Sequence, residues 1–420
     1  MYNKKILDNG LKIISHLMPD KLSVAVGVWI KVGGRYEPFK LKGIAHYLEH
    51  LIFKGSKKYS CRKIKESIEG VGGSLNGFTS EELTCFLAKV PRQYLGLALD
   101  ILTDMTLNPL LRREEVEKER AVILEEIKMY IDQPRSHKYE LLDELLWPNQ
   151  PLGMPIIGTV TSVSGINREK LHAFQKQYYT ASNIIISVAG AFNQNKLVKN
   201  IADKFRIFKP AVVTSFSHAR QEQDKPRFKL LHKATEQTHL AIGFHGLDLK
   251  HPLRFALSLL NIILGANMSS RLFNELREKR GLAYEIGTQV KYFLDTGAFI
   301  IHAGIDNRKV SESIALILKE LRKLKTNPVT KSEFRRARDF FKGQIMLALE
   351  DTLDHMLWVG ESTATLDKVF TLKDIIREVD RISPGDLRKL AKDIFREKSL
   401  NLALIGPLQE KEIQKTLKLN

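Results

Sequence analysis

The sequence contains little cysteine and no long run of apolar residues. Cys61 and Cys85 are its only cysteines among 420 residues, too few for a disulfide framework and without the paired spacing of a structural zinc site. No apolar stretch approaches the roughly 20 residues that a membrane-spanning helix needs, and the first residues lack the apolar core of a signal peptide. These absences argue against a disulfide-stabilised secreted domain and an integral membrane protein. We therefore expect a soluble, cytoplasmic protein with no membrane partner.

Negative charge is also in short supply. The chain has 48 aspartates and glutamates against 66 lysines and arginines, which gives a formal net charge of +18. Such an excess can indicate nucleic-acid binding, but that function calls for clustered basic residues interleaved with aromatics, or for a known binding motif. Neither is present, and the basic residues are spread along helix-like segments such as 309–331 and 386–398, as on solvated helical faces. The sequence therefore predicts no specific nucleic-acid partner.

The sequence contains an internal repeat, in which the second half resembles the first. Apolar residues and a glycine recur at an offset of 216 positions, in helix-like and strand-like segments alike. The first set is Ile166, Leu171, Phe174, Tyr179, Val188, Ala189 and Gly190, and its counterparts are Ile382, Leu387, Leu390, Phe395, Leu404, Ile405 and Gly406. Because 420 residues also exceed one ordinary hydrophobic core, we expect two homologous domains. They span residues 1–210 and 226–420, with a linker at 211–225 where apolar periodicity lapses.

The order of elements within the first copy predicts the fold class. Strand-like segments at 12–16, 24–31 and 74–90 are interleaved with helix-like segments, and helices dominate from 92 to 147. This mixed order favours an α+β fold in which each domain packs a mainly antiparallel sheet against helices.

A short helix-like segment carries the pattern H-x-x-E-H. His46 and His50 lie four residues apart and so project from one helical face, where two imidazoles can bind one zinc ion. Glu49 flanks that position, where a carboxylate can accept a proton from the attacking water and pass it to the leaving amine. The order is the reverse of the more common H-E-x-x-H peptidase motif. It predicts a catalytic zinc site, although a helix with two solvated histidines has the same pattern.

A glutamate-rich helix downstream offers a third zinc ligand, which a catalytic site usually needs. Glu119 and Glu126 are seven residues apart and share a helical face, whereas Glu125 points away. Val122 and Ile123 are expected to pack beside them. One carboxylate can bind zinc while the other orients a ligand histidine, and the spacing leaves open which does which. A charged surface helix is the alternative interpretation.

The residues around these positions resemble the M16 peptidase family, the group of pitrilysin, insulinase and mitochondrial processing peptidase. The likeness extends across nearly the whole chain. It rests on G-G-R-Y-E at 33–37, H-Y-L-E-H-L-I-F-K-G-S at 46–56, G-G-S-L-N-G-F-T at 72–79 and E-R-A-V-I-L-E-E at 119–126. The resemblance implies that Glu126 is the third zinc ligand, with one zinc ion per chain, and that Glu119 is the supporting carboxylate. Gly77 departs from the family pattern, in which alanine is usual.

The resemblance also implies how substrate is held. In the family, an exposed edge strand adds the substrate backbone as a further strand. The corresponding residues are Asn76, Gly77, Phe78 and Thr79. Arg277 and Tyr284 resemble an Arg/Tyr pair of the family's second kind of domain, which would hold substrate near the zinc ion, with Tyr284 at the oxyanion. The repeat offset places Ile262, Gly265, Ala266 and Lys342 at the positions of the metal motif, so the second domain is expected to hold no metal.

The resemblance thus implies a zinc-dependent endopeptidase that hydrolyses peptides or unfolded segments inside a clamshell chamber. Because one chain carries both the metal motif and the Arg/Tyr pair, a homodimer is expected, with a heterodimer containing an inactive homologue as the alternative. The rival function is a non-catalytic assembly or core subunit of the same fold. The physiological substrate and any preference for basic presequences are left open.

Overall fold

The computed structural model describes residues 2–206, 208, 211 and 214–410, which form two compact units. Unit 1 consists of Met1–Lys128, Pro155–Ser217 and Met346–Phe370. Unit 2 consists of Met129–Met154, His218–Ile345 and Thr371–Asn420. A segment of unit 1 ends at Ser217 and a segment of unit 2 begins at His218, inside the predicted linker 211–225. Residues 212 and 213 of that linker lie outside the described part.

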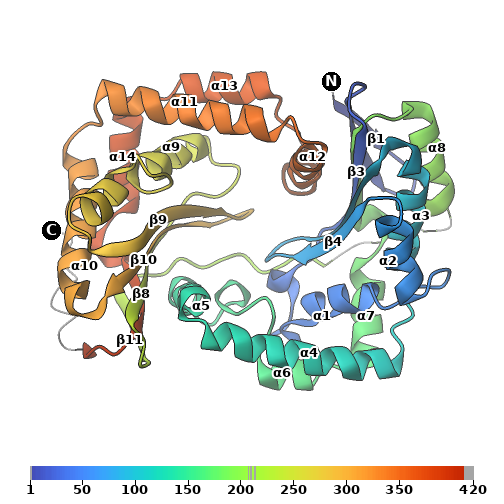
Figure 1. Cartoon of the computed structure of the whole chain (residues 1–420), viewed down its shortest axis with the longest axis horizontal. Coiled ribbons are helices and arrows are strands. Elements are labelled where there is room, and N and C mark those ends of the chain that lie inside the picture. Colours follow the sequence, from blue (N-terminus) through green and yellow to red (C-terminus); the bar gives the residue numbers. More distant parts are fainter. Residues whose placement is uncertain (1, 207, 209–210, 212–213, 411–420) are drawn as a thin grey trace. The chain divides into compact units, whose positions relative to one another are not determined.

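Unit 1 is built on a six-stranded sheet in the order β1-β2-β6-β3-β5-β4. Strands β1, β3 and β4 of this sheet are labelled in Figure 1. The strands are β1 (Tyr2–Ile6), β2 (Lys12–Leu17), β3 (Ser23–Ile30), β4 (Ser74–Thr79), β5 (Thr84–Pro91) and β6 (Ile184–Gly190). Neighbouring strands are antiparallel except β2 and β6. Strands β3 and β6 are buried almost throughout, whereas β4 alternates exposed and half-buried residues. Strand β4 pairs only with β5 and is therefore an edge strand.

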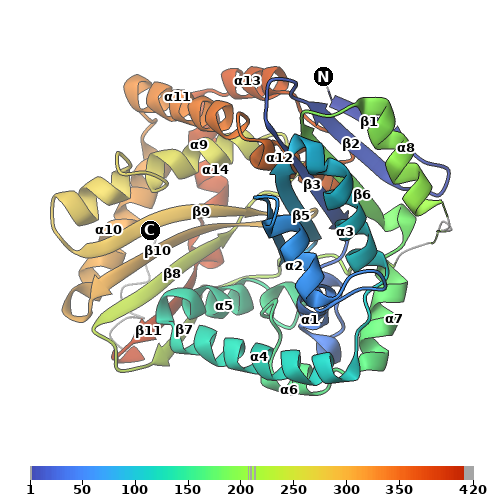
Figure 2. The same cartoon turned by 45° about the vertical axis from the view of Figure 1, so that its right-hand side comes forward.

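Both faces of this sheet are covered by helices. The first-half helices of the unit are α1 (Ile44–Ile52), α2 (Cys61–Glu69), α3 (Leu95–Leu107), α4 (Arg113–Asp132), α6 (Val160–Ser164), α7 (Arg168–Tyr178) and α8 (Gln194–Phe205). Residues of α1, α3, α7 and α8 form one apolar core with alternate residues of β3 and β6. The opposite face, which includes Trp29 and Ile185, packs against Met356 and Val359 of α12 (Thr352–Leu366). Figure 2 shows α12 beside the strands of this sheet.

Unit 2 repeats the topology of unit 1. Its strands are β7 (Arg227–His232), β8 (Gln237–His245), β9 (Ala283–Tyr292), β10 (Gly297–Asp306) and β11 (Asn401–Gly406), in the order β7-β11-β8-β10-β9. This is the order β2-β6-β3-β5-β4 of unit 1, including one parallel pair at the corresponding place. The α+β class with two mainly antiparallel, helix-covered sheets is therefore confirmed.

The offset between the copies is not constant, contrary to the sequence analysis. Gly27 lies opposite Leu87 in unit 1, and Gly243 lies opposite Ile300 in unit 2. The first residues are 216 positions apart and the second are 213 apart, because the intervening segment is shorter in the second copy. The four residues predicted to occupy the metal positions of the second copy are thus not strict counterparts.

The two halves of the chain exchange one helix each. Helix α5 (Pro134–Leu146) follows α4 in sequence but packs through Leu141 and Leu142 against Ala241 and Ile300 of the unit 2 sheet. Helix α12 belongs to the second half and covers the unit 1 sheet. Contiguous domains at 1–210 and 226–420 omit this exchange, because apolar periodicity shows that a helix buries one face but not which sheet it covers.

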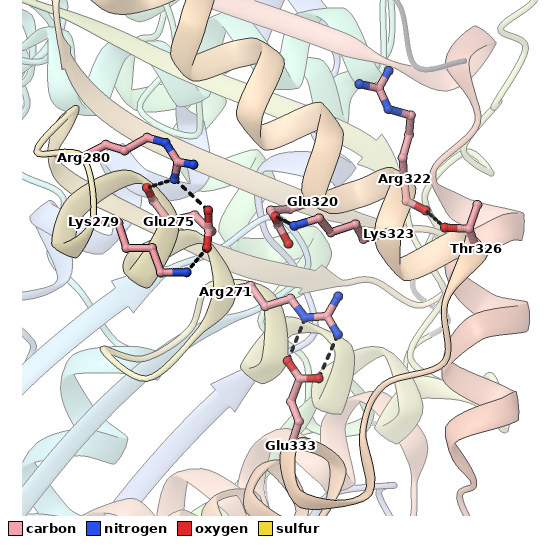
Figure 3. A network of polar contacts seen from close by, with 9 residues as sticks. All are labelled: Arg271, Glu275, Lys279, Arg280, Glu320, Arg322, Lys323, Thr326 and Glu333. Atoms are coloured by element: carbon pink, nitrogen blue, oxygen red, sulfur yellow. Dashed lines mark hydrogen bonds and ion pairs between the residues drawn. The ribbon is translucent and has the colours of Figure 1, made fainter.

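The remaining helical segments of unit 2 are α9 (Arg254–Leu264), the π-helical segment η6 (Phe273–Glu278), α10 (Val310–Thr326), α11 (Lys331–Ala348), α13 (Leu372–Asp380) and α14 (Pro384–Ile394). Ion pairs stabilise the surroundings of η6 (Figure 3). Arg271 donates from Nε and Nη2 to the two carboxylate oxygens of Glu333 at 2.7 and 2.8 Å, which joins the start of η6 to α11. Glu275 of η6 accepts from Lys279 at 2.5 Å and from Arg280 at 2.7 Å, two residues that follow the segment. None of the described helices is long and apolar enough to cross a membrane.

Candidate metal centre

The helix that carries both histidines begins at a buried and constrained point. Gly43 precedes α1 with a φ of 94°, and a Cβ atom there would lie 2.5 Å from the carbonyl oxygen of Ile157, so only glycine fits. Glycine has no side chain that could accept hydrogen bonds from the free N–H groups at the start of the helix. Glu37 does so instead: Oε2 accepts from Gly43 N at 2.9 Å and Oε1 from Ala45 N at 2.7 Å. The carboxylate of Glu37 thereby fixes the first turn of α1, which leads directly into His46.

Glu37 also belongs to a buried charge pair. Lys42 Nζ lies 3.5 Å from Glu37 Oε2 and donates to the carbonyl oxygen of Gly34 at 2.6 Å, and both charged side chains are buried. Burial raises the pKa of Glu37, whereas Lys42 and the two backbone N–H groups act to lower it. The pair and the helix cap therefore depend on one carboxylate that sequence analysis did not single out.

Glu37→Ala is expected to destabilise unit 1 strongly. The change removes the helix cap and the carboxylate that compensates Lys42, and breaking a buried ion pair costs about 3–5 kcal/mol. Urea unfolding followed by circular dichroism measures the loss. The matched control is Asn193→Ala, which removes the cap of α8 (Asn193 Oδ1 to Lys196 N, 3.0 Å) and should cost only about 1 kcal/mol. Equal effects of the two changes would show that Glu37 acts only as a cap.

Three side chains of unit 1 form a group with the geometry of a metal site. The Nε2 atoms of His46 and His50 lie 4.0 and 3.7 Å from Oε2 of Glu126, and the three potential ligand atoms lie within 4.8 Å of one another. Ligand atoms around a tetrahedral zinc ion are about 3.3 Å apart, so a small contraction would bring these into range. Within the described ranges, no other cluster of His, Cys, Asp or Glu meets the same criterion. The residues present therefore fit a zinc ion.

The electrostatics of the group also suit metal binding. Burial, with a smaller contribution from neighbouring His50, lowers the pKa of His46 to about 3, so its imidazole is neutral at neutral pH. Neutral imidazole is the form that binds metals. Burial raises the pKa of Glu126, and His50 opposes that shift.

The two glutamates of α4 occupy different places around His50. Glu126 faces Nε2 of His50, whereas Glu119 Oε2 lies 3.1 Å from Nδ1 of the same ring. The other oxygen of Glu119 lies 2.6 Å from Lys54 Nζ. The spacing of the sequence left these places open. The geometry is that of a ligand carboxylate at Glu126 and an orienting carboxylate at Glu119.

Helix α4 differs from the sequence prediction in one residue. Ile123 is buried in the core as expected, but Val122 is 49% exposed and is not buried beside the glutamates. The two residues are about 100° apart around the helix, so Ile123 can be buried in the core while Val122 is turned toward solvent. Glu125 points outward and pairs with Lys128 at 2.6 Å, as the spacing predicted. The hydroxyl of Tyr47 donates to the carbonyl oxygen of Val116, which joins α1 to α4.

Glu49, a residue of α1, contacts the last residue of the edge strand β4. The hydroxyl of Thr79, the last residue of β4, donates to Glu49 Oε2 at 2.7 Å. Burial raises the pKa of Glu49; the bond from Thr79 and the proximity of His50 oppose this, and Glu126 raises it further. The carboxylate is thus held in place with a proton affinity above that of a solvated glutamate, which suits a general base.

The other residues predicted on β4 lie along its open side. Asn76 and Phe78 are exposed, and the ring of Phe78 makes an edge contact with Trp29 at 5.7 Å between centroids. A Cβ atom at Gly77 would lie 3.0 Å from the ring of Phe53. The glycine therefore makes room for Phe53, which follows α1 directly, and an alanine here would require that ring to shift.

Arg277 and Tyr284 lie together in unit 2. Arg277 Nη1 donates to the carbonyl oxygen of Tyr284 at 2.9 Å, and its guanidinium lies 4.9 Å from the ring centre of Phe273. The side chain of Tyr284 is 76% exposed and could contact a ligand. Both residues belong to unit 2, whereas the histidines and Glu126 belong to unit 1, and their part in one site stays a prediction.

Known proteins resemble this chain over nearly its whole length. Residues 12–160 match the family described as insulinase (peptidase family M16), and residues 165–341 match the peptidase M16 inactive domain. A protein of Bacillus subtilis (strain 168), described as an uncharacterized zinc protease, is 36% identical over 408 residues, which are 97% of this chain and 98% of that protein. The chain belongs to the M16 peptidase family. The residues that match the insulinase description include His46, His50 and Glu126 of the candidate metal group.

Other M16 relatives support the same assignment. An uncharacterized zinc protease of Streptomyces coelicolor is 34% identical over 97% of the M16 chain and 90% of its own length. A crystal structure of a Helicobacter pylori protease has a TM-score of 0.90 at 24% identity, covering 97% and 99% of the two chains. A chain of complex III2 from Candida albicans has a TM-score of 0.85 at 18% identity, with 99% of each chain covered. At these identities, the two structures show the fold alone.

Proposed function

We propose that this M16 chain is a zinc-dependent endopeptidase that hydrolyses peptides or unfolded protein segments. The observation that carries the proposal is the convergence of His46, His50 and Glu126 next to a carboxylate, Glu49, that makes no bond to any of them. Three potential ligands with a separate base are what a hydrolytic zinc site requires. The names of the relatives as zinc proteases support the same metal and reaction.

His46, His50 and Glu126 would hold one zinc ion per chain. When bound there, zinc supplies Lewis acidity toward the scissile carbonyl and the attacking water. Glu49 accepts the proton of that water and delivers it to the leaving amine, so that the peptide bond breaks with one carboxyl and one amino product. Thr79 holds the carboxylate of Glu49 in position through both transfers.

The edge strand provides the means to bind an extended peptide. Among the described residues, no strand pairs with the side of β4 that faces away from β5, so a substrate strand can add there through main-chain hydrogen bonds. The substrate contacts would come from Asn76, Gly77, Phe78 and Thr79. A strand added here passes Thr79 and therefore the carboxylate of Glu49. Only unfolded or extended segments can bind in this way, and the affinity depends little on sequence.

Arg277 and Tyr284 are proposed to complete the site from the second kind of domain. The exposure of Tyr284 and its contact with Arg277 support a pair that binds the substrate or the oxyanion. We further propose a homodimer enclosing a chamber, with a heterodimer containing an inactive homologue as the alternative.

A non-catalytic subunit is the competing function, because the fold is shared with a chain of complex III2. The complete ligand group and the oriented Glu49 favour the peptidase. Zinc analysis of the purified chain by mass spectrometry, together with cleavage of a quenched-fluorescence peptide library, discriminates between the two. We expect about one zinc per chain, loss of cleavage with 1,10-phenanthroline and recovery on adding zinc. A chain with no stoichiometric zinc and no cleavage would support the subunit instead.

A further inference from the structure

We propose that Lys54 is a positioning residue of the metal site that acts on His50 through Glu119. The inference rests on the proposed zinc site and adds a residue that touches neither the metal ligands nor the substrate strand. Lys54 lies four residues after His50, just past the end of α1. Its ammonium group therefore sits one helical turn beyond the imidazole, on the side of α4.

The carboxylate of Glu119 bridges the two residues. Oε1 lies 2.6 Å from Lys54 Nζ, and Oε2 lies 3.1 Å from His50 Nδ1. A carboxylate bound through one oxygen can rotate, whereas one bound through both has a fixed plane. Glu119 is only 5% exposed, so water compensates little of its charge and the two protein partners must do so.

This orientation decides which nitrogen of His50 faces the metal. When Nδ1–H donates to Glu119, the lone pair is on Nε2, which lies 3.7 Å from the Glu126 carboxylate. His46 lacks a comparable support: in the described part of the chain, its Nδ1 is buried and has no hydrogen-bond partner. The orientation of the imidazole pair therefore depends mainly on His50, and through Glu119 on Lys54.

The alternative is that Lys54 and Glu119 form an ordinary ion pair with no role at the metal. Such pairs contribute about 0–1 kcal/mol to stability, and their loss leaves a distant site unchanged. Lys89 is a matched example within unit 1: its Nζ lies 2.6 Å from Asp351 Oδ2, and its side chain is 32% exposed, against 29% for Lys54. The pair lies outside the ligand group, so Lys89→Met controls for the loss of one lysine and one ion pair.

The test measures zinc affinity by competition with a fluorescent chelator, using the full-length chain and zinc alone as the ligand. Lys54→Met is expected to weaken zinc binding about 10-fold or more, the range seen when supporting groups of metal ligands are removed. Lys54→Arg, which keeps the charge, should restore most of the affinity. Lys89→Met should bind zinc as the wild type does. In the metal-free chains, Lys54→Met is expected to lower the urea midpoint more than Lys89→Met, because Glu119 is buried and loses a partner, whereas the side chain of Asp351 is 41% exposed.

A double variant shows whether Lys54 acts through Glu119. If it does, Lys54→Met adds little to the loss caused by Glu119→Gln, because the effects of coupled residues are not additive. Wild-type affinity in Lys54→Met, or a full additional loss in the double variant, would overturn the inference. A wild-type chain that binds no zinc would overturn the proposed function as well. Normal zinc binding and cleavage in Lys54→Met would reject only the role of Lys54.

Discussion

Glu49→Gln is expected to lower kcat for peptide cleavage about 1,000-fold while the chain keeps its zinc. Glutamine has the same size and can still accept the hydrogen bond from Thr79, but its amide cannot take a proton from the attacking water. Peptide binding should not depend on the charge of residue 49, so KM should change little. Initial rates with a quenched-fluorescence peptide, together with zinc content from the same preparation, measure both expectations.

The control for this change is Glu125→Gln. Glu125 lies beside the proposed ligand Glu126 in sequence but points outward and pairs with Lys128, so its substitution should leave the rate at the wild-type value. Cleavage by Glu49→Gln at the native rate would show that another group is the base. Loss of zinc together with activity would show that Glu49 is needed to hold the metal.

His46→Ala is expected to remove zinc and activity together. One of three ligand atoms disappears, and the two that remain cannot form a closed site, so zinc affinity should fall by more than about 100-fold, beyond the loss expected for a supporting group. Chelator competition measures the affinity, and added zinc should not restore cleavage at concentrations that saturate the wild type. The matched control is His172→Ala, a histidine of α7 outside the metal group, which should retain both properties. Stoichiometric, tight zinc in His46→Ala would contradict the ligand assignment.

The parts of the site that were predicted from sequence are those governed by one helix. His46, Glu49 and His50 follow from the 3.6-residue period of α1, since residues three and four apart share a face. The same period placed Glu119 and Glu126 on one face of α4. It could not assign their places around His50, because that depends on the contact between α1 and α4 rather than on either helix alone.

Features made by contacts between distant segments were not predictable in this way. Glu37 lies in a segment picked out only by its likeness to a family motif, and nothing local shows that its carboxylate receives the N–H groups of Gly43 and Ala45. From the sequence alone, Lys54 is indistinguishable from an ordinary surface lysine, because only the fold shows its contact with Glu119. Likewise, the repeat revealed two similar sheets but not the exchange of α5 and α12, since each helix shows the same amphipathic pattern whichever sheet it covers.

The exchange of helices has a consequence for biosynthesis. The unit that carries the candidate metal group needs α12 to cover Trp29 and Ile185, and α12 (Thr352–Leu366) follows the H-x-x-E-H motif at a long distance in the sequence. A nascent chain on the ribosome therefore contains the complete H-x-x-E-H motif long before α12 is available to cover the second face of the unit 1 sheet. A polypeptide that stops after the first half would expose an apolar sheet face instead of folding into a separate zinc-binding domain. Premature termination thus yields a target for chaperones and quality-control proteases, and unit 1 is complete only once α12 has been synthesised.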